Sequence, residues 1–224
     1  MTGIVVQARM GSSRLPGKIL KMLGSKTLLE HIVYRIGFLK HEATLVIATT
    51  TLPADDKVEQ FCSTRHIDCF RGSEKNVLER YYLCAQKYEF KTIMRLTADN
   101  PFTDIEELDR LIELQQTSGA DFCHSFKSLP VGVGAEIFTF KALKLSFQNA
   151  KEPHHIEHVD EYLLEHPETF KTQELSVPAE KRHPEARLTI DTESDYKKAS
   201  YIVGHAAQDY VTTQEALKLC LEYA

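Results

Sequence analysis

Short apolar segments alternate with amphipathic segments along the first half of the chain. The apolar segments, rich in β-branched side chains, predict strands at 3–8, 44–50, 67–70 and 92–97. Apolar side chains recur at helical spacing between them and predict helices at 28–39, 55–63, 77–87 and from 103 to about 117. Strands and helices that alternate in this way are typical of right-handed βαβ units around a largely parallel sheet.

The pattern is looser in the second half of the chain. It predicts strands at 135–140, 175–178 and 187–190, helices at 141–149, 155–165 and 194–204, and a loop at 128–134. Two capping boxes, Thr103 with Glu106 and Thr212 with Glu215, each predict the start of a helix. The sequence contains no repeat or linker, and its length suits one sizeable core, so we predict a single domain over residues 1–224.

The composition is that of an ordinary globular protein, with 42% hydrophobic and 26% charged residues. The net charge of −5 is against a general nucleic-acid binder, because no basic excess is present to neutralise a phosphate backbone. Neither a secretory signal nor an apolar run of membrane-spanning length is visible, and the five cysteines contain no CxxC pair. We therefore expect a cytoplasmic protein with reduced thiols, and neither nucleic acid nor a membrane as partner.

The stretch at 7–20, QARMGSSRLPGKIL, carries the candidate chemistry. It follows the first predicted strand and places two glycines, two serines and a proline among three cations, Arg9, Arg14 and Lys18. A glycine-rich turn after a strand exposes backbone N–H groups that bind anions, and nearby Arg and Lys side chains add charged hydrogen bonds. The stretch indicates a polyphosphate site; the alternative is an ordinary turn with solvated charges.

This stretch resembles the opening of the cytidylyltransferases that activate acidic sugars, whose pattern is I-x-A-R-x-x-S-x-R-L-P-G-K. Every fixed position after the first is present: Ala8, Arg9, Ser12, Arg14, Leu15, Pro16, Gly17 and Lys18. The closer match is the branch of spore coat polysaccharide biosynthesis protein F, which opens QARMGS-x-RLPGK. The similarity also covers ATTTLPADD, FRGSEKNVLERY, the segment around Asp99 and LTIDT, and so spans most of the chain.

The resemblance implies an α/β fold of three layers, a Rossmann-like nucleotidyltransferase fold with a mostly parallel central sheet. It also implies a small dimerisation flap and a homodimer, for which the segment at about 120–185 is the candidate, either for dimerisation or for binding the acceptor. Ligands of such sheets bind at the carboxyl ends of the strands. The loop at 7–20 should therefore meet the residues that follow the strands at 44–50, 67–70 and 92–97.

Two aspartates follow predicted strands at this edge. Asp99 comes just after the strand at 92–97, and Asp191 just after the strand at 187–190. Paired carboxylates suit Mg²⁺, which takes few protein oxygens together with phosphate oxygens and water. In the family resembled, aspartates at the matching places hold the metal beside the α-phosphate. Alternatively, Asp99 is a turn residue and Asp191 is a helix cap.

The reaction implied by the resemblance moves CMP from CTP to an acidic sugar or related acid and releases pyrophosphate. Such transfer needs positioning and charge neutralisation more than a covalent nucleophile. The implied catalytic residues are Arg14, Lys18, Asp99 and Asp191. The implied nucleotide-binding residues are Ala8, Arg9, Met10, Gly11, Ser12, Ser13, Arg14, Lys18, Arg71, Gly72, Ser73 and Asp99. Arg71 is equally well interpreted as a surface partner of Glu74.

The candidates for binding the acceptor are Arg95, Glu136 and His158. Glu136 and the triplet Glu157-His158-Val159 match the spore-coat branch, and Arg95 offers a cation from a predicted strand. The histidines at 154, 155 and 158 suggest a zinc site, but they lack the HExxH spacing of helical zinc ligands. We therefore interpret them as polar surface, with His158 as a candidate contact of the acceptor.

Three other functions remain open from the sequence. A glycosyltransferase that uses a nucleotide-sugar would usually present an Asp-x-Asp motif, and none is found in this chain. A nucleotidyltransferase acting on a phosphorylated acceptor is not excluded. A nucleotide-binding regulator that has lost turnover is disfavoured by the intact set of cations and aspartates.

Overall fold

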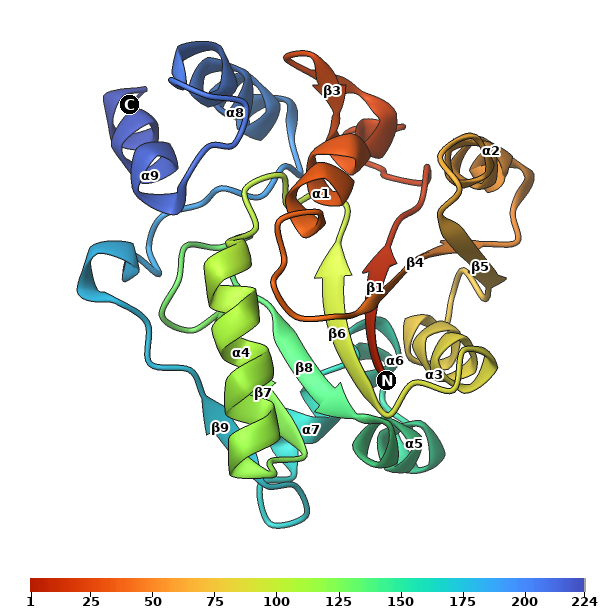
Figure 1. The fold of residues 1–224 in the computed structure, drawn as a ribbon. Coiled ribbons are helices and arrows are strands. Elements are labelled where there is room, and N and C mark those ends of the chain that lie inside the picture. The colour runs from red at the N-terminus through yellow and green to blue at the C-terminus, as the bar shows by residue number, and fades with distance from the viewer. Residues whose placement is uncertain (224) are drawn as a thin grey trace.

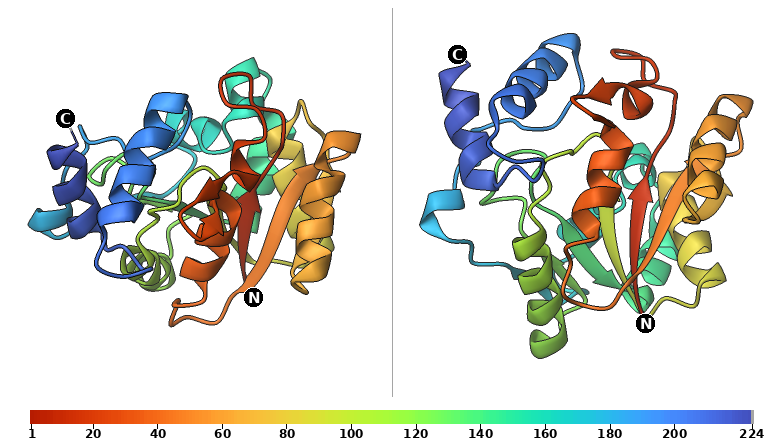
Figure 2. Two further views of the ribbon diagram at one scale, coloured as in Figure 1. Left: turned by 90° about the horizontal axis from the view of Figure 1, so that it is seen from above. Right: turned by 45° about the horizontal axis from the view of Figure 1, so that its top comes forward.

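The computed structural model describes residues 1–223, in which a central sheet lies between two layers of helices (Figures 1 and 2). Within these residues the sheet has seven strands in the order β5-β4-β1-β6-β8-β7-β9. Their bounds are β1 Thr2–Gln7, β4 Thr44–Thr50, β5 Asp68–Gly72, β6 Thr92–Thr97, β7 Phe122–His124, β8 Glu136–Thr139 and β9 Thr172–Glu174. The pairings are parallel except those of β8, which runs antiparallel to β6 and β7. The predicted α/β class with a mostly parallel sheet is confirmed.

Side chains alternate between the two faces of the sheet, as the strand period requires. On β1, Ile4 and Val6 join one hydrophobic core and Val5 joins the other. The first core is covered by α1 Leu28–Ile36, α2 Asp56–Thr64, α4 Ile105–Ser118, α8 Glu193–His205 and α9 Thr213–Glu222. The second is covered by α3 Val77–Lys87, α5 Phe140–Asn149, α6 Pro153–Glu157 and α7 Glu161–Glu165. None of the helices in the described part of the chain has the length and apolar character of a membrane span.

Short elements complete the chain. They are the 3₁₀ helices η1 Lys18–Leu20, η2 Pro53–Asp55 and η3 Ala179–Lys181, and a hairpin of β2 Met22–Leu23 with β3 Lys26–Thr27. The arrows of β1 and β6 point to the same edge of the sheet in Figure 1. The loops that leave this edge are therefore the ones able to share a ligand.

Both predicted capping boxes need correction. Helix α4 is capped by Asp104, whose carboxylate accepts from the Glu107 amide at 3.1 Å, whereas the Thr103 hydroxyl donates to a turn carbonyl. Thr212 does cap α9, accepting from the Glu215 amide at 3.2 Å. The Glu215 carboxylate, however, accepts from the amide of residue 207 instead of returning to the cap. The carboxylates of Glu106 and Glu215, which the local pattern assigned to the helix ends, thus bind groups outside their own helices.

The second half of the chain departs most from prediction. The helix expected at 155–165 is split into α6 and α7, because His158 has the extended angles φ −111° and ψ 105°. The prediction of a strand at 175–178 is wrong. The nearby strand β9 ends at Glu174, one residue before this segment, and it pairs with β7, which was not predicted. The segment at 187–190 forms a single bridge between Arg187 and Val131 instead of a strand. These pieces are too short to show a hydrophobic period, so only their partners define them.

The loop before β8 packs closely on the segment that leads to Asp191. Gly132 has φ +92°, and a Cβ there would lie 2.6 Å from the backbone nitrogen of Thr189. Gly132→Ala should therefore lower the free energy of unfolding by about 1–3 kcal/mol, measured by urea denaturation. Gly119→Ala is the matched control, because Gly119 also has positive φ (+61°) but nothing within 4 Å of its Cβ position. Equal losses in the two variants would contradict a role for the close packing.

Candidate functional site

A cavity of about 370 Å³ lies at the carboxyl ends of β1 and β6. The loop after β1 forms one wall, and residues that follow β6 and precede α8 form another. The lining residues are Gln7, Ala8, Arg9, Gly11, Ser12, Ser13, Arg14, Lys18, Ile19, Val77, Arg80, Thr97, Ala98, Asp99, Glu157, His158 and Asp191. Most of the predicted nucleotide-binding residues are thus brought together.

The loop after β1 is fixed through Met10 and Asp55. The Met10 amide donates to Oδ1 of Asp55 at 2.6 Å, and the Met10 carbonyl accepts from the amides of Ser12 and Gly17 at 3.0 and 3.1 Å. Asp55 is buried and its other oxygen accepts from both the amide and the hydroxyl of Thr50. Gly17 adopts φ 68°, which L side chains rarely do, so the turn into η1 requires glycine. Met10 itself is not part of the cavity lining, and its side chain packs against the first hydrophobic core.

This loop offers donors to an anion. Within residues 1–223, the amides of Gly11, Ser13 and Arg14 donate to no protein group. The side chains of Arg9 and Arg14 are 41% and 61% exposed beside the same cavity. Free amides together with two partly exposed guanidinium groups form a surface that suits phosphate oxygens.

Lys18 joins the two aspartates that the sequence singled out. Its Nζ lies 2.6 Å from Oδ2 of Asp99 and 2.9 Å from Oδ1 of Asp191, and it also donates to the Ile190 carbonyl at 2.8 Å. The Ile190 amide donates to the Asp99 carbonyl at 2.9 Å, which holds the two acidic segments side by side. The carboxylates, distant in sequence, therefore face one point at the floor of the cavity.

Further cations surround Asp191. Arg14 lies 3.1 Å and Arg187 2.5 Å from its carboxylate oxygens. Burial opposes ionisation of this carboxyl, but Lys18, Arg187 and Arg14 together lower its pKa below the usual value. Asp195 fixes the backbone by accepting from the Asp191 amide at 3.1 Å. Asp191 is thus an oriented, ionised carboxylate.

The same pair of carboxylates fits Mg²⁺. Both side chains keep about a quarter of their surface exposed to the cavity, and both have an oxygen within hydrogen-bond reach of one Lys18 nitrogen. Two hard oxygen donors that converge beside an anion-binding loop match the preference of Mg²⁺ for a few carboxylates plus phosphate. Asp99 and Asp191 are therefore the residues that would hold this ion.

The predicted base-binding group at 71–73 does not line the cavity. Arg71 donates to the carbonyls of Thr50 and Leu52 at 2.9 Å and pairs with Asp56 and Glu59. The expected partner Glu74 is therefore wrong. Gly72 and Ser73 are likewise absent from the lining; two strands, β4 and β1, lie between β5 and β6. Residues 71–73 therefore do not contact the cavity directly, although the Ser73 carbonyl accepts from Arg80, which lines it.

The predicted set of site residues leaves out two residues that shape the cavity. In the sequence Arg80 is only a weaker candidate for binding the base, since it can equally be a charge on a helix face; the structure places it in the cavity lining, only 2% exposed, with Nη1 donating to the Ser73 carbonyl at 2.5 Å. Burial lowers the pKa of this guanidinium, and its Nε has no partner among the described residues. In the sequence Asp55 is only one of the acids at the start of a predicted helix, whereas in the structure it holds the loop through the Met10 amide.

A second cavity, of about 230 Å³, adjoins the first through shared lining residues Thr97 and His158. Its lining includes all three predicted acceptor residues, Arg95, Glu136 and His158. Arg95 pairs with Glu136 and lies 3.5 Å from Asp160. Burial opposes the charge of Arg95, yet the neighbouring carboxylates raise its pKa. For Glu136, burial raises the pKa to about 7, although Arg95 acts to lower it.

Glu136 should make stability depend on pH. Folded Glu136 keeps its proton up to about pH 7, whereas its usual pKa is 4.5, so the folded state binds more protons in this window. The stability of wild type relative to Glu136→Gln should fall by on the order of 1–2 kcal/mol as the pH rises through that window, measured by urea denaturation. Glu222→Gln, an exposed carboxylate on α9, is the control. A constant difference across the window would contradict the burial of an ionisable Glu136.

Comparisons with known proteins agree with this geometry. A family model described as cytidylyltransferase matches residues 3–219. The chain is 40% identical over 204 residues to spore coat polysaccharide biosynthesis protein SpsF of Bacillus subtilis, covering 88% of this chain and 85% of the relative. The structure of a cytidylyltransferase from Leptospira borgpetersenii superposes with TM-score 0.91 at 32% identity, covering 99% of this chain and 94% of that chain.

A more distant structure shares the fold. The CMP:2-keto-3-deoxy-manno-octonic acid synthetase, solved with CTP, superposes with TM-score 0.69 at 18% identity, covering 91% of this chain and 98% of that chain. The family match spans nearly the whole sequence and includes every loop that lines the first cavity. The chain therefore belongs to the cytidylyltransferase family.

Proposed function

We propose that the protein transfers CMP from CTP to an acidic sugar or a related acid, with Mg²⁺ and with release of pyrophosphate, in the synthesis of a surface polysaccharide. The observation that carries this proposal is the convergence of Lys18, Asp99 and Asp191 beneath a loop with free amides. Oriented charges that can hold a metal ion, next to a loop whose amides can bind phosphate, are what phosphoryl chemistry requires.

The triphosphate would lie along the loop after β1. The amides of Gly11, Ser13 and Arg14 would hold the β- and γ-phosphates, with the guanidinium groups of Arg9 and Arg14. Lys18 is a buried cation at the end of this loop and would face the α-phosphate, where charge grows during transfer. Preorganised charges of this kind lower the barrier because they do not need to reorient in the transition state.

The acceptor would occupy the second cavity, beside Thr97 and His158. From there its oxygen reaches the α-phosphorus across the shared wall, opposite to the leaving pyrophosphate. Asp99 and Asp191 would hold Mg²⁺, which when bound would supply charge neutralisation and lower the pKa of the attacking oxygen. Arg95 keeps Glu136 and Asp160 in place at the far side of the cavity.

The names of relatives support the choice of acceptor and pathway. One relative is named for spore coat polysaccharide biosynthesis, and others, 24–27% identical, are named as cytidylyltransferases of 3-deoxy- or 8-amino-3,8-dideoxy-manno-octulosonate. The acceptors in these names are acids. We extend the class of acceptor to this chain, but not a particular sugar.

The test has two stages. A thermal-shift screen of the four nucleoside triphosphates, with and without Mg²⁺, should show the largest shift with CTP and Mg²⁺, because binding to the folded state raises its stability. The protein is then incubated with CTP, Mg²⁺ and a panel of acidic sugars, and pyrophosphate is measured by ³¹P NMR. Pyrophosphate that appears only with an acidic sugar supports the proposal.

Other outcomes identify the alternatives. Transfer from a UDP-sugar without pyrophosphate would favour a glycosyltransferase. Pyrophosphate release that occurs only with a phosphorylated acceptor would favour a nucleotidyltransferase acting on such acceptors. CTP binding without pyrophosphate under any acceptor would favour a regulator.

We also propose that the chain forms a homodimer through the segment at about 120–185. Support comes from the resemblance to the family, in which a flap at this place joins two subunits. The edge strand β9 and the helices α6 and α7 fall inside this segment. Light scattering coupled to size-exclusion chromatography would give twice the chain mass of 25.5 kDa for a dimer.

A further inference from the structure

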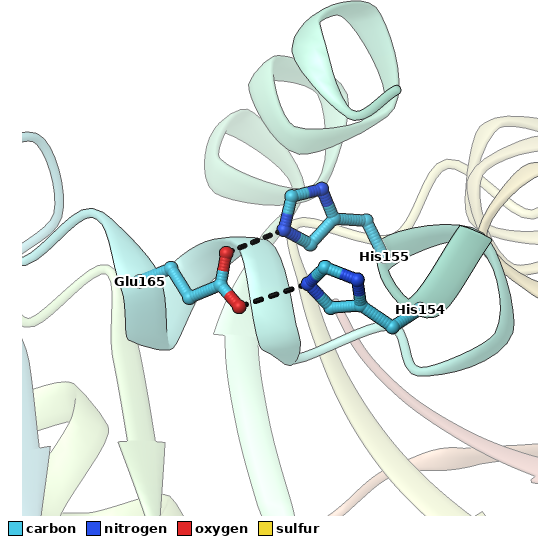
Figure 3. Close-up of side chains that lie close together, drawn as sticks. All are labelled: His154, His155 and Glu165. Carbon is cyan, nitrogen blue, oxygen red and sulfur yellow. Dashed lines mark hydrogen bonds and ion pairs between the residues drawn. The ribbon is translucent and has the colours of Figure 1, made fainter. Parts of the chain in front are cut away.

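A cluster of side chains outside both cavities joins α6 to α7. His154 and His155 are consecutive residues of α6, and Glu165 is the last residue of α7. Nε2 of His154 lies 2.9 Å from one oxygen of Glu165, and Nε2 of His155 lies 2.6 Å from the other (Figure 3). One potential ligand atom from each of the three residues can be chosen so that all lie within 4.8 Å of one another.

The surroundings of the cluster leave an ion access to these three side chains. His155 is buried, 5% exposed, and its Nδ1 faces away from Glu165 (Figure 3) and has no partner among the described residues. Nε2 of His155, which contacts Glu165, is therefore the nitrogen that would ligate an ion. His154 and Glu165 remain nearly half exposed, at 46% and 45%, so an ion could enter and keep water on its open side.

The donor set selects the kind of ion. Imidazole nitrogens suit Zn²⁺ and its neighbours in the first transition row, whereas Mg²⁺ prefers oxygen. Two histidines and one carboxylate leave a fourth tetrahedral position to water. Bonds of about 2.1 Å place tetrahedral ligand atoms about 3.4 Å apart. The present separations of His154 and His155 from Glu165 differ from this by less than an ångström, which side-chain rotation can supply.

We propose that His154, His155 and Glu165 form a site for a divalent transition metal ion of the Zn²⁺ type. The ion would link α6 to α7, at a site distinct from the cluster of Lys18 with the two aspartates. The turn between the helices carries His158, which lines both cavities, and Asp160, which lies beside Arg95. An ion that links the two helices would therefore hold this turn, and with it the wall between the two cavities, in place. This inference does not depend on the proposed function.

The test measures the stoichiometry and affinity of Zn²⁺ for the full chain, stripped with a chelator and then titrated in competition with a chromophoric chelator. Wild type should bind one equivalent. His154→Gln and Glu165→Gln should weaken this binding by more than the roughly 10- to 100-fold that loss of an outer partner costs. Both side chains are exposed enough for the variants to fold, which circular dichroism checks. Co²⁺ should give visible absorption bands in wild type and lose them in both variants.

Two control variants locate the ion. His183→Gln removes another surface pair of a histidine with a carboxylate, in which Nδ1 of His183 lies 3.0 Å from a Glu185 oxygen. This pair has no second histidine beside it, so the variant should bind Zn²⁺ as wild type does. Asp99→Asn alters the cavity cluster and should also leave the equivalent of Zn²⁺ in place. Saturating Zn²⁺ should raise the melting temperature of wild type and of both controls, by roughly 5–10 °C at 100 times the dissociation constant.

Three outcomes would overturn the proposal. They are absence of stoichiometric Zn²⁺ binding, binding that survives in His154→Gln and Glu165→Gln, and binding that disappears in Asp99→Asn. In the first case the carboxylate only accepts hydrogen bonds from the imidazoles; in the last the ion belongs to the cavity.

Discussion

Replacing Lys18 with methionine should lower the turnover of CMP transfer by about 100- to 1000-fold. Among residues 1–223, Lys18 is the one cation that bonds to both Asp99 and Asp191, and its side chain is only 10% exposed. Methionine retains most of the length and apolar surface of lysine. It lacks the positive charge that, in the proposed mechanism, faces the α-phosphate. Turnover is measured as pyrophosphate release at saturating CTP, and affinity for CTP by calorimetry.

Lys21→Met is the matched control for this variant. Lys21 lies one residue beyond η1, pairs with Glu193 at 3.1 Å and covers the ring of Tyr196, away from the cavity lining. It should keep turnover within about threefold of wild type, because exposed ion pairs contribute little. Comparable losses in the two variants, or an unchanged turnover in Lys18→Met, would remove Lys18 from the mechanism.

Replacing Lys181 with methionine should lower the free energy of unfolding by about 3–5 kcal/mol. Its Nζ lies 2.9 Å from Asp104 and 3.0 Å from Glu107, and all three side chains are at most 5% exposed. Burial opposes the charge of Lys181, but the adjacent carboxylates raise its pKa above the usual value. Without it, two buried carboxylates at the start of α4 lose their shared cation.

Urea denaturation followed by circular dichroism measures this loss. The control is Lys197→Met, an exposed lysine on α8, which should change stability by less than about 0.5 kcal/mol. A loss below about 1 kcal/mol in Lys181→Met would show that Arg110, at 2.6 Å from Glu107, and water satisfy the remaining carboxylates.

Local pattern predicted the first half of the fold well. The strand at 44–50, the helix at 77–87 and the strand at 92–97 have the predicted bounds. Each is long enough for its side-chain period to show which face is buried. The turn at 158–160 and strand β7 were missed, because three residues carry no period and depend on contacts with other segments.

The candidate site was predicted unevenly, for a related reason. The loop after β1 could be predicted because its glycines, proline and cations lie together in the sequence. Arg71 was assigned to the base on resemblance, but the structure pairs it with Asp56 and Glu59. The role of Asp55 depends on Met10, 45 positions away, and the burial of Arg80 depends on how α3 packs, so the local pattern showed neither.

The sequence by itself determined the α/β alternation, the glycine-bearing loop with three cations after β1, and the presence of two aspartates after core segments. Only the tertiary structure decided that Lys18 meets a carboxylate 173 positions away, and that two histidines of α6 face Glu165 of α7. Propensity and hydrophobic period act over a few residues and define the elements. Contacts between side chains far apart in sequence depend on how those elements pack, which no local pattern records.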